Sequence, residues 1–283
     1  MNNNKVIFVA SEATRQFIAL AKQMIRDGFD VTIAAPKNEN FRYLPNRQFI
    51  RLYKIGGMLF GIGIFRRFDG VIVAFDKAAE KLAKGKKRVV PFNDDIGIDL
   101  SVWNPDAISG NRQTMLLNAY NIPPHSKMIL ALEPTDKDVK ALILAIQGME
   151  RRDFIIGLYG RMSKMTARKV SRKIADSHQI IYLGNEQDLP TLMRASFAIM
   201  SMSAKTSFYK VGALAMGRTT IFPMGDIKPN IVIKNGNPAD ALIKALDLPL
   251  KARDEFEDGN IRRAQNYDLA KTTAKLKAKI QNV

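Results

Sequence analysis

The sequence contains no cysteine and two histidines among its 283 residues. Without cysteine the chain has no disulfide, no thiolate metal ligand and no cysteine nucleophile, and its composition is compatible with a reducing compartment. His125 and His178 leave little room for a histidine metal site, and we expect both to be ordinary loop residues near strand starts. No metal and no cofactor is therefore expected.

Long hydrophobic runs are also absent. No apolar run approaches the ~18 to 20 residues that a membrane-spanning helix needs. The N-terminal sequence, MNNNKVIFVASEA, contains a short apolar strand instead of the charged start and long apolar core of a signal peptide. We therefore expect a globular, cytoplasmic protein, at most peripheral at the inner face of the cytoplasmic membrane.

The sequence contains more basic than acidic residues. Lysine and arginine number 44 against 27 acidic residues, a net charge of +17, so an anionic partner is expected. Lys164, Arg168 and Arg172 recur at i, i+4 within a basic stretch and share one helical face. This basic surface is interpreted as a solvated helix face, a site for anionic lipid headgroups or a nucleic-acid surface.

A second, shorter basic cluster consists of Lys81, Lys84, Lys86, Lys87 and Arg88. Beside it lies a glycine-rich apolar stretch over residues 55–65, which is followed by Arg66 and Arg67. The stretch is expected to be a buried strand pair with glycine turns. The alternative is a segment that dips into a membrane interface beside its arginines.

Apolar runs and amphipathic segments alternate along most of the chain. Strands are predicted over residues 5–10, 31–35, 49–55, 69–75, 88–92, 127–132, 154–159, 179–183, 197–202 and 220–223. Helices are predicted over residues 14–27, 77–84, 136–147, 163–175, 188–195, 207–216, 238–246 and 251–281. This alternation predicts an α/β protein with two Rossmann-like, doubly wound parallel sheets.

Three regions follow from this pattern. Residues 1–95 form a reduced N-terminal Rossmann-like domain, short of the ~150 residues usual for a doubly wound domain. Residues 96–250 form a second Rossmann-like domain, and residues 251–283 form a C-terminal helical segment. Ligands of such sheets bind at the carboxyl ends of the strands.

Residues 197–225 are the most informative stretch, because a strand, a polar loop, a small-residue helix and a second strand follow one another closely. The backbone amides of Thr206, Ser207 and Phe208 open the helix and are candidate phosphate ligands. An ordinary capped helix is the plain alternative. The stretch has no acidic side chain, so it offers no carboxylate to hold a sugar.

Several short motifs follow one another along the chain. They are Leu20–Val31 (LAxxLxxxGHxV, with Phe29 in place of histidine), Asp69–Phe75, Ile96–Pro105 (GIDxxxFxP), Leu183 with Gly184, Asp188–Pro190 and Ala213–Gly217. In this order they resemble the motifs of retaining, nucleotide-sugar-dependent GT-B glycosyltransferases, of the group that includes lipopolysaccharide-core and other cell-envelope transferases. The resemblance implies that residues 96–250 bind a nucleotide sugar and that residues 1–95 face the acceptor.

The sequence departs from the family pattern at the positions where the family binds its donor. The two glutamates of the family correspond to Ala204 and Gly212, whose side chains accept no hydrogen bond. The basic pair that neutralises the donor diphosphate is reduced to Lys137, which is otherwise a solvated helix-start lysine. The family's Gly-Gly loop is replaced by Ser11 and Glu12, and no catalytic residue is assigned.

Three functions remain open from the sequence. The first is a glycosyltransferase that moves a sugar from a nucleotide sugar to a cell-surface polysaccharide or lipid-linked acceptor. The second is a catalytically inactive homologue that serves as a scaffold or regulatory protein partner. The third is a basic nucleic-acid-binding protein, against which the absence of a binding motif counts.

Overall fold

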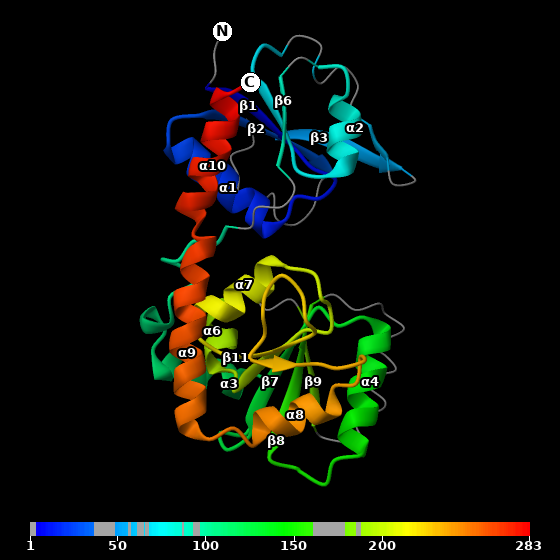
Figure 1. The fold of residues 1–283 in the computed structure, drawn as a ribbon, viewed down its shortest axis with the longest axis vertical. Helices are drawn as coiled ribbons and strands as arrows, with labels where there is room; N and C mark the ends of the chain where they lie inside the picture. Colours follow the sequence, from blue (N-terminus) through cyan, green and yellow to red (C-terminus); the bar gives the residue numbers. More distant parts are fainter. Residues whose placement is uncertain are drawn as a thin grey trace. The chain divides into compact units, whose positions relative to one another are not determined.

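The structure is a computed structural model that describes residues 4–36, 49–55, 58–60, 65, 68–86, 88–92, 97–160, 179–184 and 188–283. The chain forms two compact units: Met1–Asp99 with Tyr267–Val283 (unit 1), and Leu100–Asn266 (unit 2). Each unit is built on its own six-stranded sheet (Figure 1). Within the described residues, no helix combines the length and the apolar character needed to cross a membrane.

The sheet of unit 1 is mostly parallel. Its strands are β1 (Lys5–Val9), β2 (Asp30–Pro36), β3 (Phe49–Ile55), β4 (Met58–Phe60), β5 (Val71–Ala74) and β6 (Val89–Pro91). They lie in the order β4-β3-β2-β1-β5-β6, with β4 antiparallel to β3 at the edge. The strand order reverses between β1 and β5, so a switch point lies at their carboxyl ends. Within the stretch 55–65, strand β4 has a buried Leu59 and an exposed Met58, and residues 56–57 and 61–64 lie outside the described residues.

Helices cover both faces of this sheet. One face packs its Val6, Phe8 and Val73 against α1 (Arg15–Arg26) and α10 (Leu269–Gln281). The other face packs Ile7 and Ile72 against α2 (Lys77–Ala83). Because both faces are covered, the four residues of β1 after Lys5 and all residues of β5 are buried, which explains why these strands have continuous apolar sequences.

Unit 2 is a parallel sheet of Rossmann type. Its strands are β7 (Lys127–Leu132), β8 (Phe154–Tyr159), β9 (Ile180–Gly184), β10 (Ala198–Met200), β11 (Thr219–Phe222) and β12 (Ile231–Val232), in the order β12-β11-β10-β7-β8-β9. Its helices within the described residues are α3 (Gly110–Ala119), α4 (Asp136–Gln147), α6 (Leu189–Ala195), α7 (Phe208–Ala215), α8 (Ala239–Leu246) and α9 (Leu250–Ala264). Short 3₁₀ turns lie at Pro105–Ala107 and Gln265–Tyr267. The doubly wound, two-sheet α/β prediction is confirmed.

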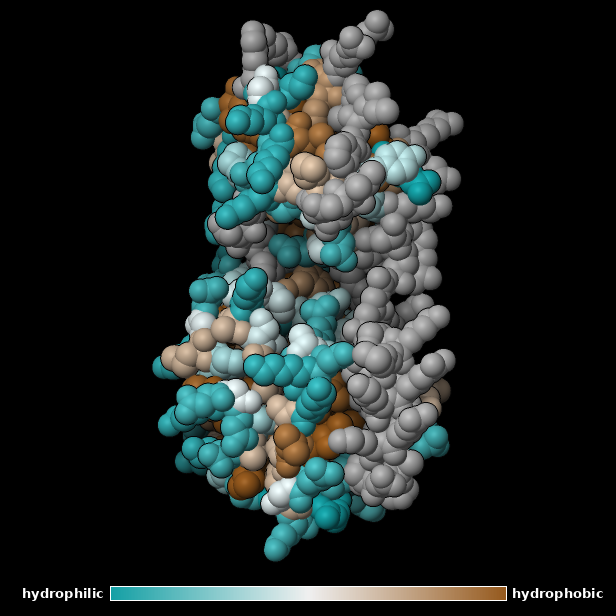
Figure 2. Space-filling model, turned by 90° about the vertical axis from the view of Figure 1, so that its right-hand side faces the viewer, coloured by the Kyte–Doolittle hydropathy of each residue, from teal (hydrophilic) through white to brown (hydrophobic). Residues whose placement is uncertain are grey.

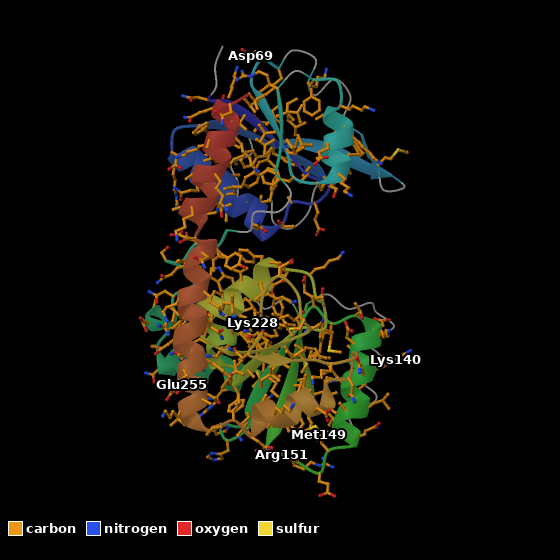
Figure 3. The ribbon with its side chains drawn as sticks, viewed as in Figure 1. Asp69, Lys140, Met149, Arg151, Lys228 and Glu255 are labelled. Atoms are coloured by element: carbon orange, nitrogen blue, oxygen red, sulfur yellow. The ribbon has the colours of Figure 1, made fainter. Side chains whose placement is uncertain are left out.

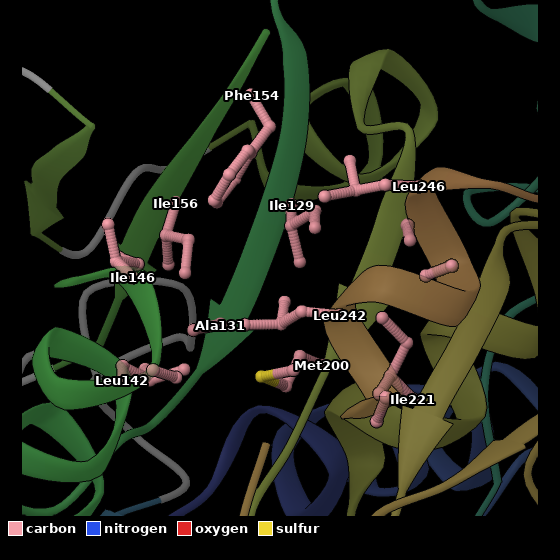
Figure 4. Close-up of a cluster of buried hydrophobic side chains, with 14 of the residues drawn as sticks. Ile129, Ala131, Leu142, Ile146, Phe154, Ile156, Met200, Ile221, Leu242 and Leu246 are labelled. Atoms are coloured by element: carbon pink, nitrogen blue, oxygen red, sulfur yellow. The ribbon is translucent and has the colours of Figure 1, made fainter. Parts of the chain in front are cut away.

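One face of this sheet carries a large core cluster (Figure 4). Ile129 and Ala131 of β7 point from the sheet toward Leu142 of α4 and Leu242 of α8. Leu130, which alternates with them along β7, is equally buried on the opposite face. The packing therefore holds α4 and α8 in place on one face of the sheet and leaves the carboxyl ends of the strands for the loops that follow them.

One prediction about an element is wrong, and one helix was missed. The single helix over 251–281 is interrupted at Gln265–Asp268: α9 belongs to unit 2, and α10 begins a new helix capped by Asp268 that packs in unit 1. The break coincides with backbone hydrogen bonds from Ile98 N to Tyr267 O and from Leu269 N to Ile98 O. The division into compact units therefore separates the C-terminal segment that was predicted as one. Helix α3 was not predicted, because all of its residues are at least partly exposed and it lacks an apolar face.

Candidate functional site

The switch point of unit 2 lies between β7 and β10, where the strand order reverses. Two loops leave this edge of the sheet: residues 133–135 lead from β7 to α4, and residues 201–207 lead from β10 to α7. Ligands of doubly wound sheets bind in this position. We therefore compare the two helix starts as possible anion sites.

The start of α4 is occupied by acidic groups of the protein itself. The Thr135 amide and hydroxyl both donate to Asp138 Oδ2, at 2.9 and 2.7 Å, and Asp136 lies in the same first turn. Glu133 precedes them with a positive φ of 45°. These carboxylates already use the positive end of the helix dipole. Lys137 is exposed there, so it is a solvated cation beside acids.

The start of α7 is different, because its first turn contains no acid. Ser207 is the N-cap and its Oγ accepts from Lys210 N at 3.3 Å. Within the described part of the chain, the amides of Thr206, Ser207 and Phe208 have no protein acceptor. The Thr206 hydroxyl donates to Asp226 Oδ2 at 3.1 Å, which ties the loop to the turn after β11. The structure thus brings the three predicted amides together at an open helix start.

A buried lysine lies behind this loop. The side chain of Lys210 is 1% exposed, its Nζ donates to the carbonyl oxygen of Ser203, and it lies 4.7 Å from the ring centre of Phe222. Burial lowers the pKa of Lys210 to about 8, and the charge of Asp226 opposes that shift. With a pKa of about 8, Lys210 is mostly protonated at neutral pH, under a loop that contains no acidic side chain.

The position of the second family glutamate is filled from another element. A Cβ built on Gly212 would lie 2.5 Å from a ring carbon of Trp103, which comes from the connector before α3. The indole packs edge to face with Phe208 at 5.4 Å, and Tyr209 continues the aromatic group to Tyr159. Gly212 is therefore required by packing, and no side chain fits at that point without a shift of the indole.

A pocket lies in unit 1 at the corresponding switch point. Its volume is about 280 Å³, and its lining residues include Ser11, Glu12, Phe75 and Asp76. Asp76 accepts from Ser11 N at 2.6 Å and from Ala79 N at 2.8 Å, so it caps α2 and holds the loop after β1. Glu12 is exposed at the pocket. The pocket therefore combines a fixed carboxylate, an exposed one and an aromatic wall.

The sequence analysis named the α7 amides as candidates but did not name Lys210 or Trp103. Lys210 is the single cation in the apolar helix sequence FYKVGALA, which is a signal of a buried charge. Trp103 gave no such signal, because its contact with Gly212 joins distant parts of the chain. The predicted basic surface, Lys164, Arg168 and Arg172, lies outside the described residues, as does the helix predicted over 163–175.

Comparison with solved structures identifies the fold. A glycosyltransferase from Rickettsia africae ESF-5 matches with a TM-score of 0.78 and 15% identity, over 99% of each chain. WaaG, a glycosyltransferase involved in lipopolysaccharide biosynthesis, matches with a TM-score of 0.72 and 12% identity, over 97% of this chain and 99% of its own. The chain has the GT-B glycosyltransferase fold. Anabaena HepE in complex with UDP and glucose matches at 0.70 and 11%, over 99% and 100% of the chains.

These matches rest on structure. No protein-family model matches the sequence, and no curated sequence matches it. At identities of 10 to 15% the likeness concerns the path of the chain over its full length and not its individual site residues. The fold that the sequence motifs predicted is confirmed.

Proposed function

We propose that this protein is a glycosyltransferase that binds a nucleotide sugar at the carboxyl edge of the unit 2 sheet and transfers the sugar to a cell-surface polysaccharide or lipid-linked acceptor. The observation that carries the proposal is the start of α7. It offers three amides without a protein acceptor, no acid and a buried lysine, at the switch point of a Rossmann-type sheet. A solved neighbour of the same fold contains UDP and glucose.

In this proposal the α7 amides hold the donor diphosphate and stabilise the charge that develops on it as the sugar bond breaks. Lys137 contributes at most a distant positive charge, because it is exposed beside Asp136 and Asp138. The unit 1 pocket is the proposed acceptor pocket, where Glu12 accepts hydrogen bonds from sugar hydroxyls.

The first prediction concerns the donor. Titration with UDP-, GDP- and ADP-sugars, followed by calorimetry, is expected to show binding of one nucleotide class in the micromolar to millimolar range, about −8 to −4 kcal/mol. Absence of binding by all three at millimolar concentration would contradict the proposal and favour the inactive, scaffold-like homologue. The missing carboxylates at Ala204 and Gly212 are the observation behind that alternative.

The second prediction concerns peripheral contact with an anionic membrane. The β3–β4 hairpin exposes Tyr53 at 57% and Met58 at 61%, and the Arg51 guanidinium lies 5.2 Å from the centre of the Tyr53 ring. An arginine with an aromatic and an apolar side chain is typical of a contact with anionic headgroups. The face drawn in Figure 2 shows both hydrophilic and hydrophobic areas over its described residues.

We expect Tyr53→Ser with Met58→Ser to reduce retention on anionic liposomes about tenfold at low salt, in a sedimentation assay. Met115→Ser is the matched control, because Met115 is 73% exposed on α3 and is expected to leave retention unchanged. Equal retention of the double variant and the native protein would contradict the hairpin contact. Stronger retention on DNA of similar charge density would favour the nucleic-acid alternative.

A further inference from the structure

The buried ammonium of Lys210 is bonded to the loop before α7, and binding of a donor at the α7 amides does not by itself require this contact. The Lys210 side chain is 1% exposed, and Ser203 supplies the one hydrogen-bond acceptor recorded for its ammonium within the described residues. A buried ammonium is costly unless its interactions are specific. Its interaction here is with a backbone carbonyl of the loop at the switch point.

The contact of Lys210 with the Ser203 carbonyl fixes the orientation of the Ser203–Ala204 peptide group. The structure contains no cis peptide bond among its described residues, and in a trans peptide the C=O and the next N–H point in opposite directions. Because the Ser203 carbonyl points inward to Lys210, the Ala204 N–H points away from Lys210. Ala204 is exposed, and within the described residues its amide has no protein acceptor. An ammonium on the carbonyl also polarises the peptide and makes this N–H a stronger donor.

The rest of the loop supports the same orientation. Ser201 Oγ accepts from Ser203 N at 3.4 Å and Ser203 Oγ accepts from Lys205 N at 3.2 Å, so the amides on both sides of Ala204 are already used. The Ala204 carbonyl lies against Gly225, where an added Cβ would be 2.2 Å from the oxygen. Among residues 203–205, the Ala204 N–H is therefore the amide left without a protein acceptor within the described residues, and it lies at the position where the resembling family has a carboxylate.

We propose that Lys210 is a positioning residue that holds the Ser203–Ala204 peptide with its N–H outward, where it donates to an oxyanion of the donor nucleotide sugar. This inference rests on the proposed function. It reverses the polarity of that position: a carboxylate accepts from sugar hydroxyls, whereas this amide requires an acceptor. The oxyanion is either the diphosphate or the carboxylate of a uronic sugar, which share the same hydrogen-bond chemistry.

The test compares Lys210→Met with Lys127→Met as the matched control. Lys127 Nζ also donates to a backbone carbonyl, that of Leu246 at 3.0 Å, and lies 5.2 Å from the ring centre of Phe197. Lys127 is the first residue of β7, whereas the candidate site lies at the carboxyl end of that strand. The probes are UDP, UDP-glucose and UDP-glucuronate, measured by calorimetry. Thermal unfolding is recorded for each variant, because loss of a purely structural lysine would lower the Tm.

We expect Lys210→Met to weaken binding about tenfold with an unchanged or raised Tm, since it removes a buried charge. Lys127→Met is expected to leave binding unchanged. A loss on all three probes identifies the diphosphate as the oxyanion, and a loss restricted to UDP-glucuronate identifies the carboxylate. Binding by Lys210→Met equal to that of the native protein overturns the inference while the proposed function stands. No binding by the native protein overturns both.

The pH dependence of donor binding by the native protein tests the role of the Lys210 ammonium even if Lys210→Met fails to fold. The pKa of Lys210 is lowered by burial to about 8, Asp226 is the ionisable group whose charge acts on it, and the Ser203 carbonyl and Phe222 ring do not titrate. The ammonium is therefore lost as the pH rises through about 8, and UDP-glucose affinity is expected to fall about threefold between pH ~6.5 and ~8.5. A flat profile overturns the inference. Lys210→Arg, which keeps the charge, is expected to bind with no fall over that range.

Discussion

Gly212→Glu, the substitution that restores the second glutamate of the resembling family, is expected to destabilise unit 2 severely. An added Cβ would lie 2.5 Å from one ring carbon of Trp103 and 2.9 Å from two others, and Gly212 itself is buried in α7. The indole is 5% exposed and packs against Phe208, so it has no open side to move into. Overpacking and a buried carboxylate add to each other. We expect a loss of about 4 kcal/mol or more in the free energy of unfolding, measured by urea denaturation followed by circular dichroism.

The matched control is Ala204→Glu, which places the same carboxylate at the first family position. Ala204 is exposed in the loop, so its stability change is expected to stay within ~0.5 kcal/mol. Trp103→Ala should relieve the clash, and the double variant is expected to be less unstable than the sum of the two single variants. A Gly212→Glu protein as stable as the native one would show that the indole does not occupy this space.

Glu257→Gln is expected to destabilise the packing of α9 in unit 2. Glu257 Oε1 accepts from Arg194 Nη1 of α6 at 2.5 Å, and Oε2 accepts from Arg218 Nη2 before β11 at 2.7 Å. The three side chains are 27%, 21% and 20% exposed. Burial and the charge of Arg194 both lower the pKa of Arg218 to about 10, while Glu257 opposes this shift. Removing the carboxylate leaves two half-buried cations facing each other, at a cost of about 3 kcal/mol.

Glu255→Gln is the control for this substitution, because Glu255 is exposed on the same helix (Figure 3) and its loss is expected to change stability by less than ~0.5 kcal/mol. Urea denaturation measures both. Hydrogen exchange is expected to show faster opening of α9 in Glu257→Gln, since α9 packs on α7 and carries Asn260, whose amide donates to Arg218 O at 2.8 Å. Equal exchange rates in the two variants would contradict the role assigned to Glu257.

Much of the fold could be predicted because its elements depend on local patterns. The strands of β7 and β8 and the helix α4 match their predicted bounds, since buried apolar runs and a Thr135 cap are visible in the sequence itself. The break between α9 and α10 was not visible, because both segments are polar and charged. It is decided by the backbone pairing of Ile98 with Tyr267 and Leu269, which joins residues far apart in the chain.

In the candidate site, too, contacts between distant parts of the chain could not be predicted from local sequence patterns. The sequence by itself determined that the loop and helix over 201–215 contain no acid, that the chain is strongly basic and that its elements alternate as in two doubly wound sheets. Only the tertiary structure decided that Trp103 occupies the space beside Gly212, that acids cap α4 while α7 stays open, and that Lys210 turns the Ser203–Ala204 peptide. The physical reason is that composition and periodicity are properties of neighbouring residues, whereas packing and the burial of a charge depend on elements brought together by folding.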